Sequence, residues 1–95
     1  MTTISRILAA AADQLDPHAT MTHPIGGHEI PVCMTTGWLD LAVGDAVTAV
    51  LHHIPGFMRL ADQFAIIAAA RRALPPVAGT IAEYATQLRT LAGAL

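Results

Sequence analysis

The chain has 95 residues, of which 54% are hydrophobic and only 13% are charged. Five arginines, no lysine and seven acidic residues leave a formal net charge of −2, so no basic stripe exists to follow a phosphate backbone, and general nucleic-acid binding is disfavoured. The single cysteine, Cys33, excludes an intramolecular disulfide framework and fits a reducing, cytoplasmic setting. We therefore expect one domain over residues 1–95, held by packing alone or by packing with a partner.

No apolar run approaches the roughly 20 residues that a membrane-spanning helix needs. The longest extends only from Phe64 to Ala70, so we do not expect membrane insertion. Arg6 and the apolar residues 7–12 loosely resemble a signal peptide, but Asp13 interrupts the apolar stretch too early. We interpret this segment as a helix of the mature protein.

Residues 4–15 place apolar side chains at the i, i+3, i+4, i+7 spacing of one helical face. This spacing predicts a first helix, which Thr2 or Thr3 can cap at its start. We expect it to end at Asp16, because the residue before Pro17 is disfavoured in the helical region.

The segment from Met21 to Cys33 predicts a short β-hairpin or an extended loop. Pro24 and Pro31 exclude a helix, and Gly26-Gly27 accepts the positive φ angles of a two-residue turn. The prolines confine both strands to edge positions. Side chains alternate between the two faces of a strand. One face would therefore carry His23, Ile25, His28, Ile30 and Val32. The other would carry Pro24, Glu29, Pro31 and Cys33.

Histidines are frequent in segment 18–33, and zinc is held by four ligands drawn from His, Cys and carboxylates. The candidate metal ligands are therefore His23, His28 and Cys33. Their spacing matches no closed structural zinc motif, and the hairpin would put Cys33 on the face opposite the histidines. A ligand-binding or metal-binding module in this segment is kept as an alternative, and no resident cofactor is expected.

Residues 36–54 allow two interpretations. An apolar stripe at helical spacing predicts a helix, whereas Gly44-Asp45 could turn a hairpin, so that residues 37–52 would form strands of an α+β domain. We favour the helix because the three alanines in this stretch are weak strand formers. In that helix, we expect Gly44 to mark a close contact with another helix.

Residues 41–51, LAVGDAVTAVL, resemble the closing segment of the small molybdate-binding barrel family, which carries a similar Gly-Asp-x-Val-Thr-Ala run. The resemblance covers eleven of the 95 residues and implies an oxyanion-binding α+β domain. Such a barrel needs strands ahead of this segment, where the sequence predicts a helix. We therefore do not assign the chain to that family.

Pro55-Gly56 breaks the chain before two further predicted helices. The third helix runs from Phe57 to Leu74, where a Pro-Pro pair stops it. The fourth begins at Thr80, which forms a capping-box pattern with Glu83.

These elements predict a mainly α fold, a small four-helix bundle-like domain with a short hairpin or extended excursion between the first two helices. The side chains expected in its core are Ile7, Leu8, Leu39, Val43, Val47, Val50, Phe57, Leu60, Phe64, Ile67, Tyr84, Leu88 and Leu91.

The third helix carries more apolar surface than one core can cover. At about 100° per residue, Ile66 lies about 200° around the axis from Phe64, so we expect it on the outer face. Small alanines flank it, and two arginines follow near the carboxyl end of the helix. The predicted partner-binding surface is Ile66, Ala69, Ala70, Ala73, Arg71 and Arg72.

The function expected from the sequence is a small, non-enzymatic protein-interaction or assembly protein that associates with itself or with another protein. A two-fold homodimer is the default form of such self-association. No nucleophile has a base and a third group at a recognisable spacing, so an enzyme is disfavoured. The bias toward alanine and arginine without lysine is typical of a GC-rich bacterial genome, in which small proteins are often accessory or mobile-element products.

Overall fold

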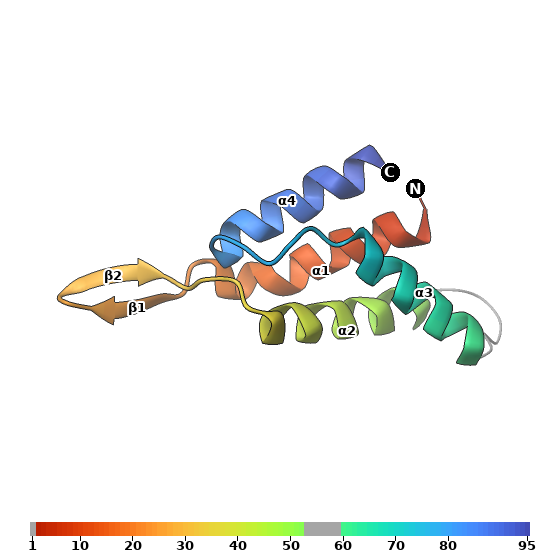
Figure 1. Ribbon diagram of the computed structural model, residues 1–95, viewed down its shortest axis with the longest axis horizontal. Helices are drawn as coiled ribbons and strands as arrows, with labels where there is room; N and C mark the ends of the chain where they lie inside the picture. Colours follow the sequence, from red (N-terminus) through yellow and green to blue (C-terminus); the bar gives the residue numbers. More distant parts are fainter. Residues whose placement is uncertain (1, 53–59) are drawn as a thin grey trace.

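The computed structural model describes residues 2–52 and 60–95, and in these residues the chain forms four α-helices and one antiparallel hairpin (Figure 1). The mainly α fold with a hairpin between the first two helices is confirmed. The α+β alternative is wrong, because residues 37–52 are helical throughout. In chain order the elements are α1 (Thr3–Ala19), β1 (Thr22–Ile25), β2 (His28–Pro31), α2 (Thr36–His52), α3 (Leu60–Ala73) and α4 (Ile81–Ala94).

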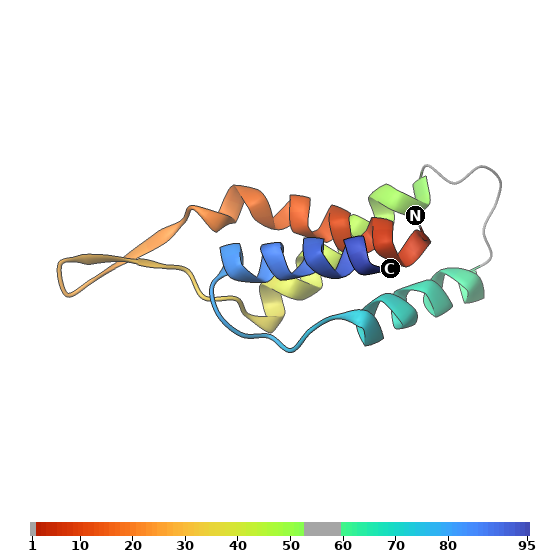
Figure 2. The ribbon, with the colours of Figure 1, turned by 90° about the horizontal axis from the view of Figure 1, so that it is seen from above.

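Helix α1 is the centre of the fold. It packs most extensively against α4 and α2 and much less against α3. The hairpin projects from one end of the helices in both views (Figures 1 and 2), which gives the molecule an elongated form of 53 × 23 × 19 Å. In the described part of the chain, no helix is long and apolar enough to cross a membrane.

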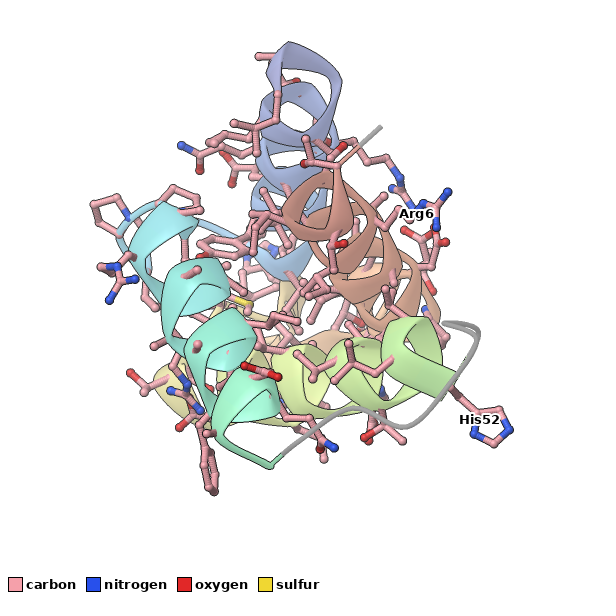
Figure 3. The ribbon with its side chains drawn as sticks, turned by 90° about the vertical axis from the view of Figure 1, so that its right-hand side faces the viewer. Arg6 and His52 are labelled. Atoms are coloured by element: carbon pink, nitrogen blue, oxygen red, sulfur yellow. The ribbon has the colours of Figure 1, made fainter. Side chains whose placement is uncertain are left out.

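The core lies where the four helices converge. Viewed from the end opposite the hairpin, side chains fill the space between the helices, whereas Arg6 and His52 point outward (Figure 3). Of the predicted core, seven side chains are buried, namely Ile7, Leu8, Leu39, Val43, Val47, Tyr84 and Leu88, and three more are partly buried against them, namely Val50, Ile67 and Leu91. Phe64 is 61% exposed, so its assignment to the core is wrong. Phe57 and the side chain of Leu60 lie outside the described residues.

Helix α1 begins as predicted, because the Thr2 hydroxyl oxygen accepts a hydrogen bond of 3.0 Å from the backbone N–H of Ser5. The end predicted at Asp16 is wrong, since the helix continues through Pro17 to Ala19. Pro17 has no backbone N–H, so the last part of α1 lacks one backbone hydrogen bond. Contacts of the last turn offset that loss, because Ala19 packs against the core and the neighbouring His18 ring contacts the Trp38 ring.

The hairpin has the predicted turn, with φ angles of 58° at Gly26 and 81° at Gly27. The N–H of Val32 donates to the carbonyl of Met21 at 3.2 Å. Bonded and non-bonded pairs alternate along an antiparallel ladder. Counting from Met21 and Val32, the pairs Thr22–Pro31 and Pro24–Glu29 are therefore non-bonded. Both prolines occupy positions where an N–H would point away from the partner strand.

The base of the hairpin is tied to the start of α4. The N–H of Met34 donates to the carbonyl of Gly79 at 2.9 Å, and the N–H of Ile81 donates to the carbonyl of Val32 at 3.1 Å. Cys33, between these residues, pairs with Thr80 in an isolated bridge. Thus the loop before α4 fixes where the hairpin leaves the bundle.

The fourth helix has the predicted capping box. The Thr80 hydroxyl oxygen accepts from the N–H of Glu83 at 3.2 Å, and the Glu83 carboxylate accepts from the N–H of Thr80 at 3.1 Å. In α2, by contrast, the close contact expected at Gly44 is wrong. A Cβ atom built there meets nothing within 4 Å, so Gly44 lies on an open face.

Candidate functional site

Helix α3 faces the core with the side that the sequence analysis placed outside. Ala70 is fully buried, and Ile66, Ile67 and Ala73 pack against the core. The 200° separation of Ile66 from Phe64 is correct, but the two were assigned to the wrong sides: Phe64 is exposed and Ile66 packs against the core, whereas Ile67 packs there as predicted. The two adjacent isoleucines offer the core more aliphatic surface than the alanines that surround Phe64.

The outward side of α3 is apolar around Phe64, and the exposed Arg71 follows on the same side two turns further along. Phe64, Ala61 and Ala65 are exposed and Ala68 is half-buried. We call these four residues the Phe64 face. With 61% of its surface exposed, Phe64 is the most exposed of the large apolar side chains in the described residues.

Among the other residues of the predicted surface, Ala69 is half-buried, whereas Arg71 and Arg72 are exposed. The guanidinium of Arg71 donates to Asp40 of α2 at 3.1 Å, with each side chain about half exposed. This ion pair joins α3 to α2, so Arg71 is engaged within the fold. Of the predicted partner-binding set, Arg72 stays next to the Phe64 face with its charge directed to solvent.

The hairpin carries the candidate metal ligands on an exposed strand face. His23 lies opposite Ile30 and His28 lies opposite Ile25, so neither histidine directly faces the other across the ladder. Cys33 lies beyond the strands with an exposed free thiol. Across residues 2–52 and 60–95, no three side chains among His, Cys, Asp and Glu come together in a group that could hold a metal ion.

A small pocket of ≈ 40 Å³ lies between α1 and α2. This volume is far below the roughly 300–1,000 Å³ of typical small-molecule sites. At one side of it the His18 and Trp38 rings lie 4.4 Å apart between centroids, at an interplanar angle of 42°. The complete lining is Gln14, Leu15, His18, Trp38, Leu41, Ala42 and Asp45.

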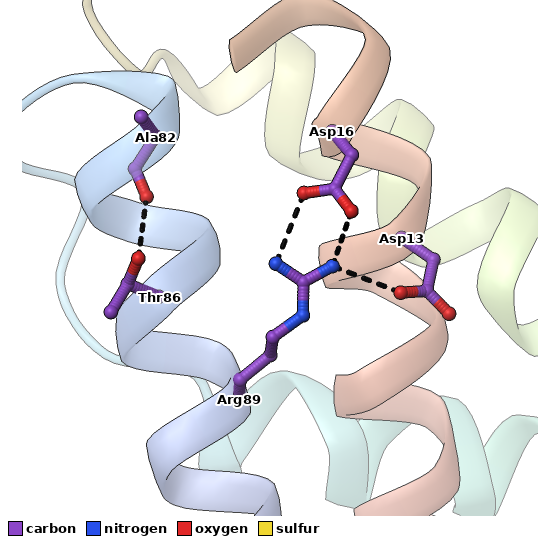
Figure 4. A network of polar contacts seen from close by, with 5 residues as sticks. All are labelled: Asp13, Asp16, Ala82, Thr86 and Arg89. Carbon is purple, nitrogen blue, oxygen red and sulfur yellow. Dashed lines mark hydrogen bonds and ion pairs between the residues drawn. The ribbon is translucent and has the colours of Figure 1, made fainter.

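An ion-pair network joins α4 to α1 on another side of the molecule (Figure 4). Arg89 donates to Asp13 at 2.9 Å and to Asp16 at 3.0 Å, with a further bond from its second terminal nitrogen to Asp16. The hydrogen bond from Arg89 lowers the pKa of Asp16 below its ordinary value, against a smaller opposing effect of desolvation. Because all three side chains satisfy one another, the network is a surface contact between helices rather than a site for a ligand.

Comparison of the chain with protein-family models, curated proteins and solved structures found no match. The geometry of the described residues is therefore the basis for a functional proposal. The Phe64 face was missed because α3 has apolar residues around most of its circumference, so that periodicity does not distinguish its inner side from its outer side.

Proposed function

We propose that this chain is a non-enzymatic assembly protein that associates with a second copy of itself through the Phe64 face of α3. The observation that carries the proposal is the 61% exposure of Phe64, one of only two phenylalanines in the chain. Fully burying a phenylalanine side chain is worth about 1.5–3 kcal/mol. A surface that covers Phe64 would gain much of that free energy.

The surroundings of Phe64 favour another helix as the covering element. Ala61, Ala65 and Ala68 lie beside it, and such small side chains allow a second helix axis to approach closely. A two-fold axis perpendicular to α3 would set the two α3 helices antiparallel and place each Phe64 against the alanines of the other copy.

Native mass spectrometry and sedimentation equilibrium of the untagged protein test this proposal. We expect a dimer for the wild type and a folded monomer for Phe64→Glu. The matched control is Leu41→Glu on α2, because Leu41 is similarly exposed at 57% but lies outside the Phe64 face. A wild type that stays monomeric at all concentrations, or a Phe64→Glu variant that still dimerises, contradicts the proposal.

The alternative function, a ligand-binding or metal-binding module, draws support from the position of His23 and His28 on one exposed strand face. The same native mass spectrum separates the two proposals. Retained metal mass that disappears in His23→Gln and His28→Gln would favour the metal-binding module.

A further inference from the structure

His23 and His28 occupy diagonal positions on one face of the hairpin. His23 of β1 pairs with Ile30, and the next pair on the same face joins Ile25 to His28. Each histidine is therefore one diagonal step from the other across the two strands. Diagonal neighbours in an antiparallel ladder are roughly 7–8 Å apart, which long and aromatic side chains can bridge. The hairpin thus brings two imidazole rings within reach of one metal ion.

The face that carries the two histidines is open to a second molecule. All residues of both strands are exposed, and the hairpin projects beyond the helices in both views (Figures 1 and 2). The two-residue turn at Gly26-Gly27 fixes the register of the strands. The diagonal placement of the rings is therefore set by the fold of the single chain.

Two histidines are half of a zinc coordination set, because structural zinc almost always has four ligands. Glu29 is the one carboxylate of the hairpin, but it lies on the opposite face and accepts a hydrogen bond from the Thr22 hydroxyl. In the part of the chain that the structure describes, no third His, Cys, Asp or Glu side chain completes a group that could hold a metal ion. A closed site therefore needs ligands from another molecule.

We propose that the hairpins of two copies hold one zinc ion between them, with His23 and His28 of each copy as its ligands. A two-fold axis through the ion relates the two histidine pairs and supplies the four ligands that tetrahedral zinc takes. In this contact Ile25 and Ile30, which are 60% and 41% exposed, face the second hairpin, and covering their apolar surface is favourable. The site rests on the metal-binding alternative and does not involve the Phe64 face of α3.

Sedimentation equilibrium and native mass spectrometry with added zinc chloride test the site in the Phe64→Glu variant, in which the other expected contact between copies is removed. We expect the monomer to become a dimer that is saturated at one zinc ion per two chains and that dissociates in EDTA. In the same background, His23→Gln and His28→Gln should each abolish the zinc-dependent dimer. The matched control is His52→Gln, which replaces an exposed histidine of α2 and should leave that dimer unchanged.

The wild type separates the zinc site from the Phe64 face. If both contacts form, zinc should link the wild-type dimers into larger assemblies, because each chain then makes two different contacts with other copies. A wild type that is monomeric without zinc and dimeric with it would contradict the Phe64 face but support the zinc site. Binding of one zinc ion per chain without association, a zinc-dependent dimer that survives both histidine substitutions, or the absence of bound zinc would overturn the zinc site alone.

Discussion

The hydroxyl of Ser5 in α1 donates a hydrogen bond of 2.7 Å to the backbone carbonyl of Ala92 in α4. Ser5 is only 1% exposed, and besides Tyr84 it is the one buried side chain with a hydroxyl group among the described residues. Ala92 lies in the last turn of α4, where carbonyl groups lack a partner within the helix. The serine therefore satisfies a buried acceptor that the helix itself leaves open.

Ser5→Ala should lower the free energy of unfolding by about 1–2 kcal/mol, because it leaves that carbonyl without a donor. Chemical denaturation measures the loss. The matched control is Thr90→Ala on the surface of α4, where the hydroxyl donates to the carbonyl of Thr86 in the same helix. That change should stay within about 0.5 kcal/mol of the wild type. Equal effects of the two substitutions would show that the Ser5 bond does not stabilise the α1–α4 contact.

Tyr84→Phe should destabilise the protein in a pH-dependent way. The buried Tyr84 hydroxyl donates to the carbonyl of Pro75 at 2.8 Å, and burial raises the pKa of Tyr84 above its ordinary value. The hydrogen bond should contribute about 1 kcal/mol at neutral pH. Because the folded pKa is the higher one, this stability is complete below about pH 10, where the unfolded phenol titrates, and is lost as the pH rises through the folded value.

The expected observation is a gap in stability between the wild type and Tyr84→Phe that is constant from pH 6 to 9 and narrows above about pH 10. Tyr84 is the only tyrosine of the chain, so its phenolate absorbance reports the folded titration without overlap. A titration at the ordinary value, or a gap that is constant throughout the alkaline range, would contradict the assigned role of burial.

Alanine substitutions at Gly44 and at Gly79 should change the free energy of unfolding in opposite directions. Gly44→Ala in the exposed part of α2 should raise the free energy of unfolding by about 0.5–1 kcal/mol, since a methyl group there meets nothing and alanine favours the helix. Gly79→Ala should lower it, because Gly79 has a φ of 71° and an added Cβ would lie 3.3 Å from Oε1 of Glu83 in the capping box. Thermal unfolding of both variants measures the contrast. Stabilisation by Gly79→Ala would mean that the turn before α4 adopts another conformation.

The sequence is most informative where local chemistry decides the structure. Gly26-Gly27 and the Thr80–Glu83 capping box specify their turn and helix start without help from distant residues. Pro17 misled the prediction, because contacts of His18 and Ala19 with residues far along the chain maintain the last turn of α1. Local propensity contains no information about such contacts.

The candidate surface could be predicted only in part for the same kind of reason. Periodicity places Phe64 and Ile66 on different sides of α3 but does not say which side packs against α1. That choice depends on the combined shape of the other three helices. We predicted an assembly role because the sequence has more apolar surface than one core can cover. In the structure, the exposed large apolar side chain of α3 is Phe64 rather than Ile66.

Pro24 and Pro31 limit how the projecting hairpin can pair with strands of other molecules. Each strand is a free edge, and a free edge ordinarily recruits strands from other molecules into open-ended, fibrillar stacks. Each proline removes one of the two N–H groups that would point outward from its own strand, and those of Thr22 and Glu29 remain. The protruding β-arm therefore offers a neighbouring strand only half of the backbone donors of an ordinary free edge.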